Sequence, residues 1–421
     1  MRETKDGGIE WIGNIPASWK SVPMRYLFRE CTTKNRLGQE KTALKFTYGT
    51  IIPKTNFDAN TDDYVANTIM SYTVVHPGVI MINCLNLNYD FVSQRIGLVK
   101  DYGAITSAYL AIEPNNQVLS AYATYQLKSW DAAKAFHNMG IGVRKTLDFS
   151  ELGKKHFVLP TLGEQKNIVA FLDSKCSEID AISADIQKEI ETLEQYKRSL
   201  VFEAISKGIN GEKTANTSSD IWKEIPQSWK LVDIKYLFEI VKRIAGREGY
   251  NILSVTQKGL KVKDISGNQG QIAENYSGYQ FVFPSDYVMN HMDLLTGWID
   301  CSDQFGVTSP DYRVFRLRDK TQNDTEYYKY VMQCCYMCRI FYSLGQGVST
   351  LGRWRLQTSA FMNFKVPVPP LHEQKEIARY LNDKCKEIEL SIEQKRKQLE
   401  LLSAYKKSLI YEYVTGKKEV I

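Results

Sequence analysis

The chain has 421 residues and a formal net charge of +6, and 43% of its residues are hydrophobic. This length predicts two or three domains, each large enough for its own core, and this composition excludes a disordered chain. The sequence has no apolar run of about eighteen residues that could span a membrane, and its first residues lack the basic-then-apolar order of a signal peptide. The eight cysteines form no regular framework, so we expect reduced thiols in a cytoplasmic globular protein.

The chain opens on a motif that returns in its second half. Residues 15–20 read IPASWK and residues 225–230 read IPQSWK. The RYLF at 25–28 likewise returns as KYLF at 235–238. A proline followed by a tryptophan is typical of an extended segment that docks an aromatic side chain, so we expect a structural role for this motif.

Short strands follow in each half, separated by turn residues. They are expected at 43–48, 72–75, 79–82, 96–99 and 109–112, and again at 250–256, 279–282, 287–290 and 312–317. A helix is expected after each set, over 118–138 and over about 325–344, and each helix is followed by two glycines. Each half should therefore contain strands, a helix, a glycine turn and a last strand that runs into a proline.

Each half ends on a long amphipathic segment, and the two copies, 164–206 and 373–414, share EQK near their starts. Apolar residues recur in steps of three and four, which predicts helices of about 42 residues and roughly 60 Å. A stripe this narrow needs a partner helix, and the other copy, running antiparallel, is the candidate. Packing of each helix on its own domain is the alternative. The expected seam residues are Ile179, Ile186, Ile190, Leu193, Tyr196, Leu200, Ile388, Ile392, Leu399, Leu402, Tyr405 and Leu409.

The sequence thus predicts an α+β protein with two pseudo-symmetric, mixed α/β domains separated by two long antiparallel helices, a coiled-coil spacer. We place the domains at 1–160 and 223–370, the helices at 161–208 and 371–421, and a linker at 209–222, where the composition is polar and rich in small residues.

The charge is unevenly distributed between these parts. Residues 164–206 carry a net charge of −4 and residues 373–414 carry +1, so the rest of the chain carries +9. The basic excess lies in the globular parts, where an anionic partner such as nucleic acid would bind.

Motifs that could support covalent chemistry are incomplete. The E-x-K at the start of each long helix has no Pro-Asp at the spacing that a metal-dependent nuclease needs. His372-Glu373 begins like a zinc protease helix, but Glu376 stands where the second histidine would be required. The C-x-x-C of Cys335 and Cys338, with Cys334 beside it, has no second pair, so we expect buried thiols and no bound metal.

Two further motifs are excluded. The glycine pairs Gly140-x-Gly142 and Gly345-x-Gly347 follow helices, so they are not dinucleotide loops. The sequence also lacks the Asn-Pro-Pro-Tyr with which amino-methyltransferases hold a flipped base. We therefore expect a binding protein without catalytic residues.

The duplicated motifs together resemble the specificity subunit of type I restriction-modification enzymes. They are two IPxSW entries, the openings PTLGEQ at 160–165 and PPLHEQ at 369–374, two long helices and the stretch at 288–315. The likeness spans nearly the whole chain in duplicated order. Thr161 and Gly163 depart from the pattern and should alter only a local turn.

The resemblance implies a non-catalytic DNA reader. Each half would carry a target-recognition domain for one part of a split DNA sequence, and the paired helices would act as a ruler between them. The helices would bind two methyltransferase (modification) subunits, which translocating and cleaving restriction subunits join. The chain itself would bind no cofactor, while the complex would use S-adenosylmethionine, and ATP with Mg for restriction. Phe171, Phe202, Tyr380 and Tyr411 are expected on helix sides that partner helices would cover.

The candidate DNA-binding residues lie in turns or beside the glycine pairs, where side chains can reach outward. They are Lys34, Asn35, Arg36, Lys45, Tyr48, Lys54, Arg144, Lys145, Lys242, Arg243, Arg247, Lys258, Lys261, Arg353 and Arg355. Asn83, Asn290 and His291 are further candidates, or else internal hydrogen-bonding groups. Two other functional classes stay open at this point: a coiled-coil scaffold that joins two protein-binding domains, and an autonomous nuclease.

Overall fold

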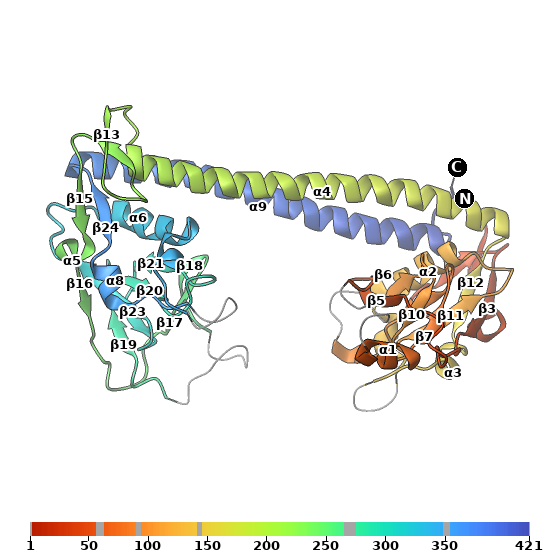
Figure 1. Ribbon diagram of the computed structural model, residues 1–421. Coiled ribbons are helices and arrows are strands. Elements are labelled where there is room, and N and C mark those ends of the chain that lie inside the picture. Colours follow the sequence, from red (N-terminus) through yellow and green to blue (C-terminus); the bar gives the residue numbers. More distant parts are fainter. Residues whose placement is uncertain are drawn as a thin grey trace. The chain divides into compact units, whose positions relative to one another are not determined.

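The computed structural model describes residues 2–55, 63–89, 94–140, 145–264, 275–347 and 354–420 (Figure 1). The chain divides into two compact units, one of Met1–Ile186 with Lys397–Ile421 and one of Gln187–Arg396. Two long helices, α4 (Leu162–Lys207) and α9 (Leu371–Val414), each contribute to both units. In the ranges given above, no helix is long and apolar enough to cross a membrane.

The first unit contains two four-stranded sheets. One has the antiparallel order β4–β11–β8–β9 (Phe28–Glu30, Leu110–Pro114, Ile80–Ile82 and Ile96–Leu98). The other has the order β6–β5–β10–β7 (Thr50–Pro53, Ala43–Thr47, Gly103–Ile105 and Thr73–Val75), in which only β5 and β10 run parallel. Two strand pairs complete it, β1–β2 (Thr4–Asp6, Asn14–Pro16) and β3–β12 (Lys20–Pro23, His156–Leu159). Its further helices are η1 (Met24–Tyr26), α1 (Asp63–Met70), η2 (Leu87–Tyr89), α2 (Ser120–Ala132), η3 (Ala135–Asn138) and α3 (Phe149–Leu152).

The second unit repeats this plan. Its four-stranded sheet has the antiparallel order β16–β23–β20–β21 (Phe238–Val241, Arg313–Leu317, Tyr287–Met289 and Ile299–Cys301). Strand pairs are β13–β14 (Thr214–Asn216, Glu224–Pro226), β15–β24 (Lys230–Asp233, Lys365–Val368), β17–β18 (Leu253–Thr256, Gly259–Val262) and β19–β22 (Gln280–Val282, Gly306–Thr308). The shorter helices are α5 (Ile234–Leu237), α6 (Thr325–Met337), α7 (Ile340–Ser343) and α8 (Thr358–Met362). Every segment predicted as a strand contains one, whereas β1, β4, β6, β10, β13, β16, β18, β21 and β22 were not predicted.

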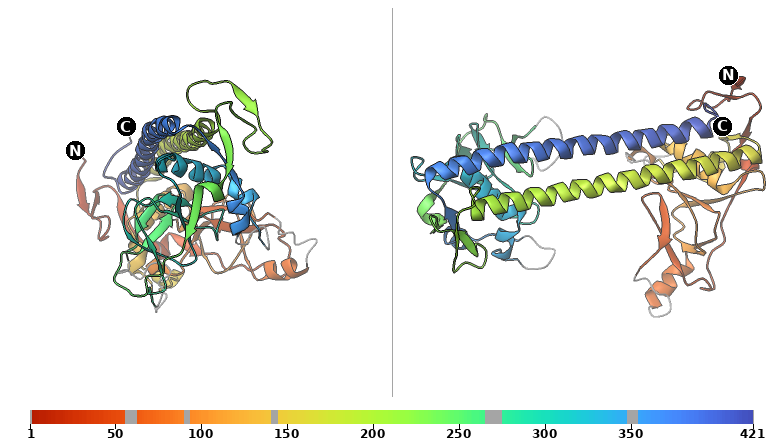
Figure 2. Two further views of the ribbon diagram at one scale, coloured as in Figure 1. Left: turned by 90° about the vertical axis from the view of Figure 1, so that its left-hand side faces the viewer. Right: turned by 90° about the horizontal axis from the view of Figure 1, so that it is seen from above.

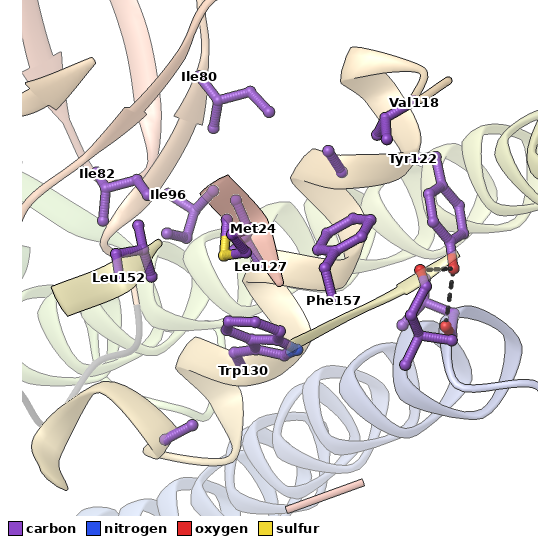
Figure 3. Close-up of a cluster of buried hydrophobic side chains, with 14 of the residues drawn as sticks. Met24, Ile80, Ile82, Ile96, Val118, Tyr122, Leu127, Trp130, Leu152 and Phe157 are labelled. Carbon is purple, nitrogen blue, oxygen red and sulfur yellow. Dashed lines mark hydrogen bonds between the residues drawn. The ribbon is translucent and has the colours of Figure 1, made fainter. Parts of the chain in front are cut away.

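The core of the first unit lies where α2 packs against strands and against both long helices. Trp130 and Phe157 are fully buried there, with ring centroids 6.3 Å apart (Figure 3). The Tyr122 hydroxyl donates to the carbonyl oxygens of Val158 (3.3 Å) and Val414 (3.0 Å), so the last turns of α9 are part of this core. Burial of these aromatic side chains is the main favourable contribution to folding here.

A tryptophan and a glutamate join the first motif of each half to the start of its long helix. The buried Trp19 indole Nε1 donates to Glu164 Oε1 at 2.9 Å, and Trp229 Nε1 donates to Glu373 Oε2 at 2.8 Å. The prediction that the IPxSW motif docks an aromatic side chain is therefore confirmed in both units. The glutamate is the partner that a buried indole N–H requires.

The glutamine that follows each glutamate is fully buried and joins the start of the long helix to the start of α2 in the first unit and of α6 in the second. Gln165 Oε1 accepts from the Leu119 N–H at 2.8 Å, and its Nε2 donates to the Pro160 carbonyl at 3.1 Å. Gln374 makes the same bonds, from the Asp324 N–H (2.8 Å) and to the Pro369 carbonyl (2.9 Å). The Glu-Gln motif is thus explained by structure.

The two long helices run antiparallel within each unit (Figure 2). In the first unit Lys406 Nζ lies 2.6 and 2.7 Å from the carboxylate oxygens of Asp180. In the second unit Lys197 pairs with Glu389, and Arg396 pairs with Glu194 at 3.0 Å. The predicted pairing of the two copies is therefore confirmed in each unit.

The seam between the helices follows a heptad spacing, which corrects two of its predicted members. Tyr196 and Tyr405 are 54% and 56% exposed, and each stands one residue before the seam position. Lys197 and Lys406 take those positions. Lys197 stands seven residues after Ile190, and Lys406 stands four residues after Leu402, as a heptad repeat requires. Their ammonium groups are among those paired above. The other predicted seam residues are buried or half-buried, namely Ile179, Ile186, Ile190, Leu193, Leu200, Ile388, Ile392, Leu399, Leu402 and Leu409.

The aromatic residues expected to need a partner's cover are covered by their own unit. The Phe171 ring lies 4.4 Å from that of Tyr413, and Phe202 stacks on Trp222 at 5.6 Å. Tyr411 donates its hydroxyl to the Trp11 carbonyl at 3.2 Å, and Tyr380 is half-buried against the second core. These side chains are therefore half-buried without a partner subunit, because the paired helix or the opening segment in the same unit packs on them.

Two other predictions, the extent of two helices and the position of the linker, are corrected by the structure. The helices expected over 118–138 and 325–344 each break at a left-handed residue, Lys134 (φ 58°) and Arg339 (φ 56°), which ends α-helical hydrogen bonding. The stretch 209–222 has the composition of a linker, but it contains β13, which pairs with β14 as β1 pairs with β2. The duplication therefore extends into this stretch.

Replacing Glu164 by glutamine tests the indole–carboxylate bond. Burial alone would raise the pKa of Glu164, but hydrogen bonds from Trp19, Arg2 and Thr161 outweigh it and lower the pKa from 4.5 to about 2. The carboxylate therefore stabilises the fold above about pH 4.5, and this contribution is lost as the pH falls towards 2. We expect Glu164→Gln to lower the free energy of unfolding by about 1–2 kcal/mol at pH 7, and by less at pH 3.

Urea unfolding at both pH values measures this difference. Glu178→Gln is the control, because Glu178 lies on the same helix in an exposed pair with Lys175. Equal effects of the two substitutions at pH 7 would show that the Glu164 carboxylate has no special structural role.

Candidate nucleic-acid interface

Three candidates of the first unit gather around the end of α1 and the start of β7. Lys34 donates to Thr73 Oγ1 at 3.3 Å, and Lys54 donates to the Tyr72 hydroxyl at 3.0 Å. Asn35 is only 4% exposed, and its Nδ2 donates to the Glu40 carbonyl at 2.7 Å. The expectation that Asn35 reaches outward is therefore wrong, since its amide holds the β4–β5 loop. Lys34 is exposed on this loop, whereas Lys54 follows β6 and is half-buried.

The β5–β6 hairpin presents an aromatic side chain in a strained conformation. Tyr48 (φ 49°) and Gly49 (φ 73°) form its two-residue turn, in which both positions favour glycine or asparagine. Tyr48 is nevertheless 83% exposed, so its ring gains no burial that would offset the strain. Lys45, on the strand that leads into this turn, is half-buried. The sequence prediction singled out both residues, and the structure places them on one hairpin.

The remaining candidates of the first unit lie apart from this hairpin. Arg36 is exposed on the loop between β4 and β5. Lys145 donates to the His137 carbonyl at 3.2 Å beside η3. Arg144 lies outside the described residues. The first-half candidates thus fall in three places: the Asn35 loop, the β5–β6 hairpin and the segment after η3.

In the second unit, arginines and aromatic rings form one surface cluster, here called the aromatic–arginine cluster. Arg243 lies over the Phe283 ring at 4.9 Å, and Arg247 lies over the Tyr250 ring at 5.5 Å. The rings contact one another, with Tyr250 and Phe281 at 5.0 Å and Phe283 and Phe305 at 5.1 Å. Phe283 and Phe305 are each 42% exposed. The members of the cluster are Arg243, Arg247, Tyr250, Phe281, Phe283 and Phe305.

The aromatic members were missed by the sequence prediction, which considered basic residues only. Residues 276–283 read YSGYQFVF, with four aromatic residues in eight positions. This density was the available signal, since stacking on exposed rings together with arginine is a common way to bind nucleic acid.

Arg243 also has a structural role. Its guanidinium lies 2.8 Å from Asp286 Oδ2, and this carboxylate accepts the Phe283 N–H at 2.9 Å. Asp286 is buried, so it needs the cation beside it. Arg243 therefore fixes the strand that carries Phe281 and Phe283.

The other basic candidates of the second unit are exposed. Lys242 precedes the cluster, and Lys258 and Lys261 lie on the β17–β18 hairpin. Arg355 is exposed, and its backbone pairs with Gln346. Arg353 lies outside the described residues.

The asparagines that follow buried strands are internal hydrogen-bonding groups. Asn83 Oδ1 accepts the Leu85 N–H at 3.2 Å, and Asn290 Oδ1 accepts the Met292 N–H at 3.2 Å. Both bonds close the turn after the strand. Burial, with Arg313 nearby, lowers the pKa of His291 to about 4, so this side chain is neutral at pH 7.

The residues of the apparent catalytic motifs serve the fold. Glu164 and Glu373 accept tryptophan hydrogen bonds, as described above. Cys334 and Cys335 are fully buried, as expected, whereas Cys338 is half-buried, and burial raises the pKa of Cys335. Among the residues that the structure describes, no group of three or more His, Cys, Asp or Glu side chains is arranged to hold a metal ion.

The part of the chain that contains the aromatic–arginine cluster is similar to a known protein domain. Residues 226–401 match the type I restriction modification DNA specificity domain. The matched residues make up most of the second unit and include every member of the aromatic–arginine cluster.

Two relatives are similar to the chain beyond this range. The type I restriction enzyme MjaVIII specificity subunit of Methanocaldococcus jannaschii is 25% identical over 338 residues, which are 76% of this chain and 75% of that protein. The putative type I restriction enzyme MjaX specificity subunit of the same organism is 24% identical over 442 residues, covering 97% and 96%. Over most of its length, the chain is therefore similar to type I restriction enzyme specificity subunits.

The fold is also similar to that of a solved structure. A chain solved in work on complex assembly and conformational transition of the type I R-M system superposes with a TM-score of 0.69 at 13% sequence identity. The superposition covers 96% of this chain and 99% of the other.

Substitution of Arg243 tests its structural role. We expect Arg243→Ala to lower the free energy of unfolding by about 2–3 kcal/mol, because the buried Asp286 carboxylate loses its cation. Lys242→Ala is the matched control, since it removes one positive charge from the adjacent exposed position. Thermal unfolding of both variants measures the difference. An Arg243→Ala variant as stable as the Lys242→Ala variant would contradict the structural role.

Proposed function

We propose that this chain reads a bipartite DNA target and directs adenine methylation and restriction by partner subunits, without catalysing either reaction. The observation that carries the proposal is the duplication: one frame, with the same Trp–Glu bond and buried glutamine, is built twice. Each copy of the frame supports one surface with residues suited to DNA. Two related domains in one chain are the arrangement that a split target requires.

The two surfaces differ, which supports different half-sites. The first unit presents the Tyr48 hairpin beside lysines, whereas the second presents the aromatic–arginine cluster. Exposed lysines such as Lys258 and Lys261 would contact phosphates and supply salt-dependent affinity. Side chains that reach base edges would supply specificity. Because α4 and α9 contribute to both units, their length would set the spacing of the half-sites.

The long helices offer surfaces for two methyltransferase subunits. Tyr196 and Tyr405 occupy equivalent positions in the two copies, and both are exposed. Leu390 and Leu401 are also exposed, at 52% and 70%. Large apolar side chains on the outside of a helix pair are typical of a protein interface. Methylation with S-adenosylmethionine, and cleavage with ATP and Mg, would belong to the partner subunits.

Genome-wide mapping of methylated adenine tests the proposal. Cells that carry this chain with its methyltransferase subunit should show a bipartite methylated motif that is absent without the chain. Exchange of residues 20–160 for those of a relative should change one half of the motif, and exchange of 230–370 should change the other. No chain-dependent motif in cells with an active methyltransferase and a stable complex would overturn the proposal.

Substitution of the exposed rings tests the role of the aromatic–arginine cluster. We expect Phe283→Ala with Phe305→Ala to weaken binding of the cognate DNA by roughly tenfold or more, since stacking contributes about 1–3 kcal/mol per base. Only recognition of the half-site read by the second unit should suffer. Leu295→Ala is the control, because Leu295 is similarly exposed, at 45%, in the same unit. Equal binding by both variants would exclude the cluster from the DNA interface.

A further inference from the structure

The first unit contains a cavity of about 580 Å³ between the β5–β6 hairpin, α2 and the paired long helices. Tyr48, Gly49 and Thr50 of the hairpin form one side, and Tyr125 and Lys128 of α2 form another. Residues of both long helices close it, among them Cys176, Asp180 and Ile410. All of these residues belong to the first unit.

Four lysines line this cavity, and only one of them has a carboxylate partner. They are Lys100, Lys128, Lys406 and Lys407. Lys406 is paired with both oxygens of Asp180. The other acidic lining residue, Asp131, is buried and accepts the Arg95 N–H at 2.8 Å. Within the described part of the chain, Lys100, Lys128 and Lys407 have no hydrogen-bond acceptor or ion-pair partner.

Lys128 is repelled by Lys406 and by Lys100. The pKa of Lys128 is lowered, first because the surrounding protein displaces water and then because Lys406 lies nearby. Unpaired like charges that face one space are unfavourable unless an anion occupies it.

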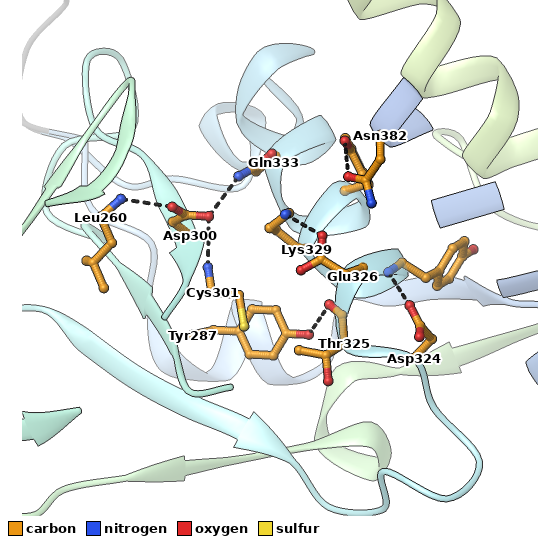
Figure 4. A network of polar contacts seen from close by, with 12 residues as sticks. Leu260, Tyr287, Asp300, Cys301, Asp324, Thr325, Glu326, Lys329, Gln333 and Asn382 are labelled. Carbon is orange, nitrogen blue, oxygen red and sulfur yellow. Dashed lines mark hydrogen bonds and ion pairs between the residues drawn. The ribbon is translucent and has the colours of Figure 1, made fainter. Parts of the chain in front are cut away.

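The second unit shows that the shared frame requires neither Lys100 nor Lys128. In the alignment of the repeats, Gln333 corresponds to Lys128 and Asp303 corresponds to Lys100. Gln333 Nε2 donates to Asp300 Oδ1 at 3.2 Å, and Asp300 also accepts the Leu260 N–H at 2.8 Å (Figure 4). That network satisfies its polar groups internally. Lys100 and Lys128 therefore have no basic counterpart in the second unit, whereas Lys407 corresponds to Arg198 of α4.

We propose that this cavity binds a phosphate of the DNA backbone through Lys100, Lys128 and Lys407, with Tyr48 at its rim against the adjoining nucleotide. The inference rests on the proposed DNA-binding function and assigns it a phosphate site. Ammonium groups on flexible stems are suited to a phosphate. Among the described lining residues there is no guanidinium, and Gln94 has the only side-chain amide that could pair with a base edge. The exposed, strained Tyr48 ring is placed to stack on a neighbouring base or sugar.

The test compares two double variants of the full chain in complex with its methyltransferase subunits. Lys128→Gln with Lys407→Gln removes two charges from the cavity. Lys20→Gln with Lys166→Gln removes two charges from exposed positions of the same unit outside the cavity, and it is the matched control. Affinity is measured for cognate and for unrelated duplex DNA over a series of salt concentrations.

We expect the cavity variant to bind both DNAs roughly tenfold more weakly than the control, because charge-assisted contacts to one phosphate are lost. The slope of log affinity against log salt should fall by about 1, while the methylated motif stays the same. Addition of inorganic phosphate at millimolar concentration should leave the difference unchanged, since the backbone phosphate is the ligand.

Other outcomes separate this inference from the proposed function. Equal affinities of the cavity and control variants, with a wild-type complex that still selects its motif, would overturn the phosphate site only. Loss of cognate binding alone would assign the cavity to base reading and also overturn it. A wild-type complex without any chain-dependent motif would overturn the proposed function, and the phosphate site with it.

Discussion

The hydrogen bond between a buried indole and the first glutamate of a long helix is the contact on which the rest of each unit depends. It fixes the opening segment of the unit against the helix start, while the neighbouring glutamine fixes the preceding helix and the last strand. A recognition domain held in this way cannot tilt on its helix without exposing unsatisfied polar groups. The shared frame is therefore rigid, and the sequence of its hairpins and loops can vary without changing how each unit is attached to the long helices.

The differences between the two units lie where the frame leaves freedom. At one equivalent position Gln333 closes a network in the second unit, whereas Lys128 faces a cavity in the first. The hairpin tips also differ, with an exposed tyrosine at a left-handed turn in one unit and a lysine in the other. Since the frame supplies the stability, these positions are free to carry charge and strain that a core would not tolerate.

Periodicity and duplication were enough to predict both long helices, their antiparallel pairing and the alternation of strands and helix in each half. They failed where a single residue decides the geometry. Tyr196 and Tyr405 stand three residues after a seam leucine and were therefore predicted on the seam. The heptad repeat instead places the following lysine there, and the ammonium group of each lysine pairs with a carboxylate of the other helix. Asn35 looks like a polar loop residue, yet loop polar groups are often used to hold the loop itself. The aromatic–arginine cluster joins residues far apart in sequence, so no local pattern of charge could reveal it.

Because each unit takes part of both long helices, neither half of the chain is a finished fold when it is read in order. The core of the first unit includes Leu409, Ile410 and Val414 of α9. During synthesis this half must therefore wait, with the apolar face of α4 uncovered, until almost the last residues have been made. A chain that stops after α4 lacks one wall of its core and is a substrate for aggregation or proteolysis. The same arrangement ensures that only a complete chain presents a stable first recognition surface, so that an incomplete one cannot compete for DNA.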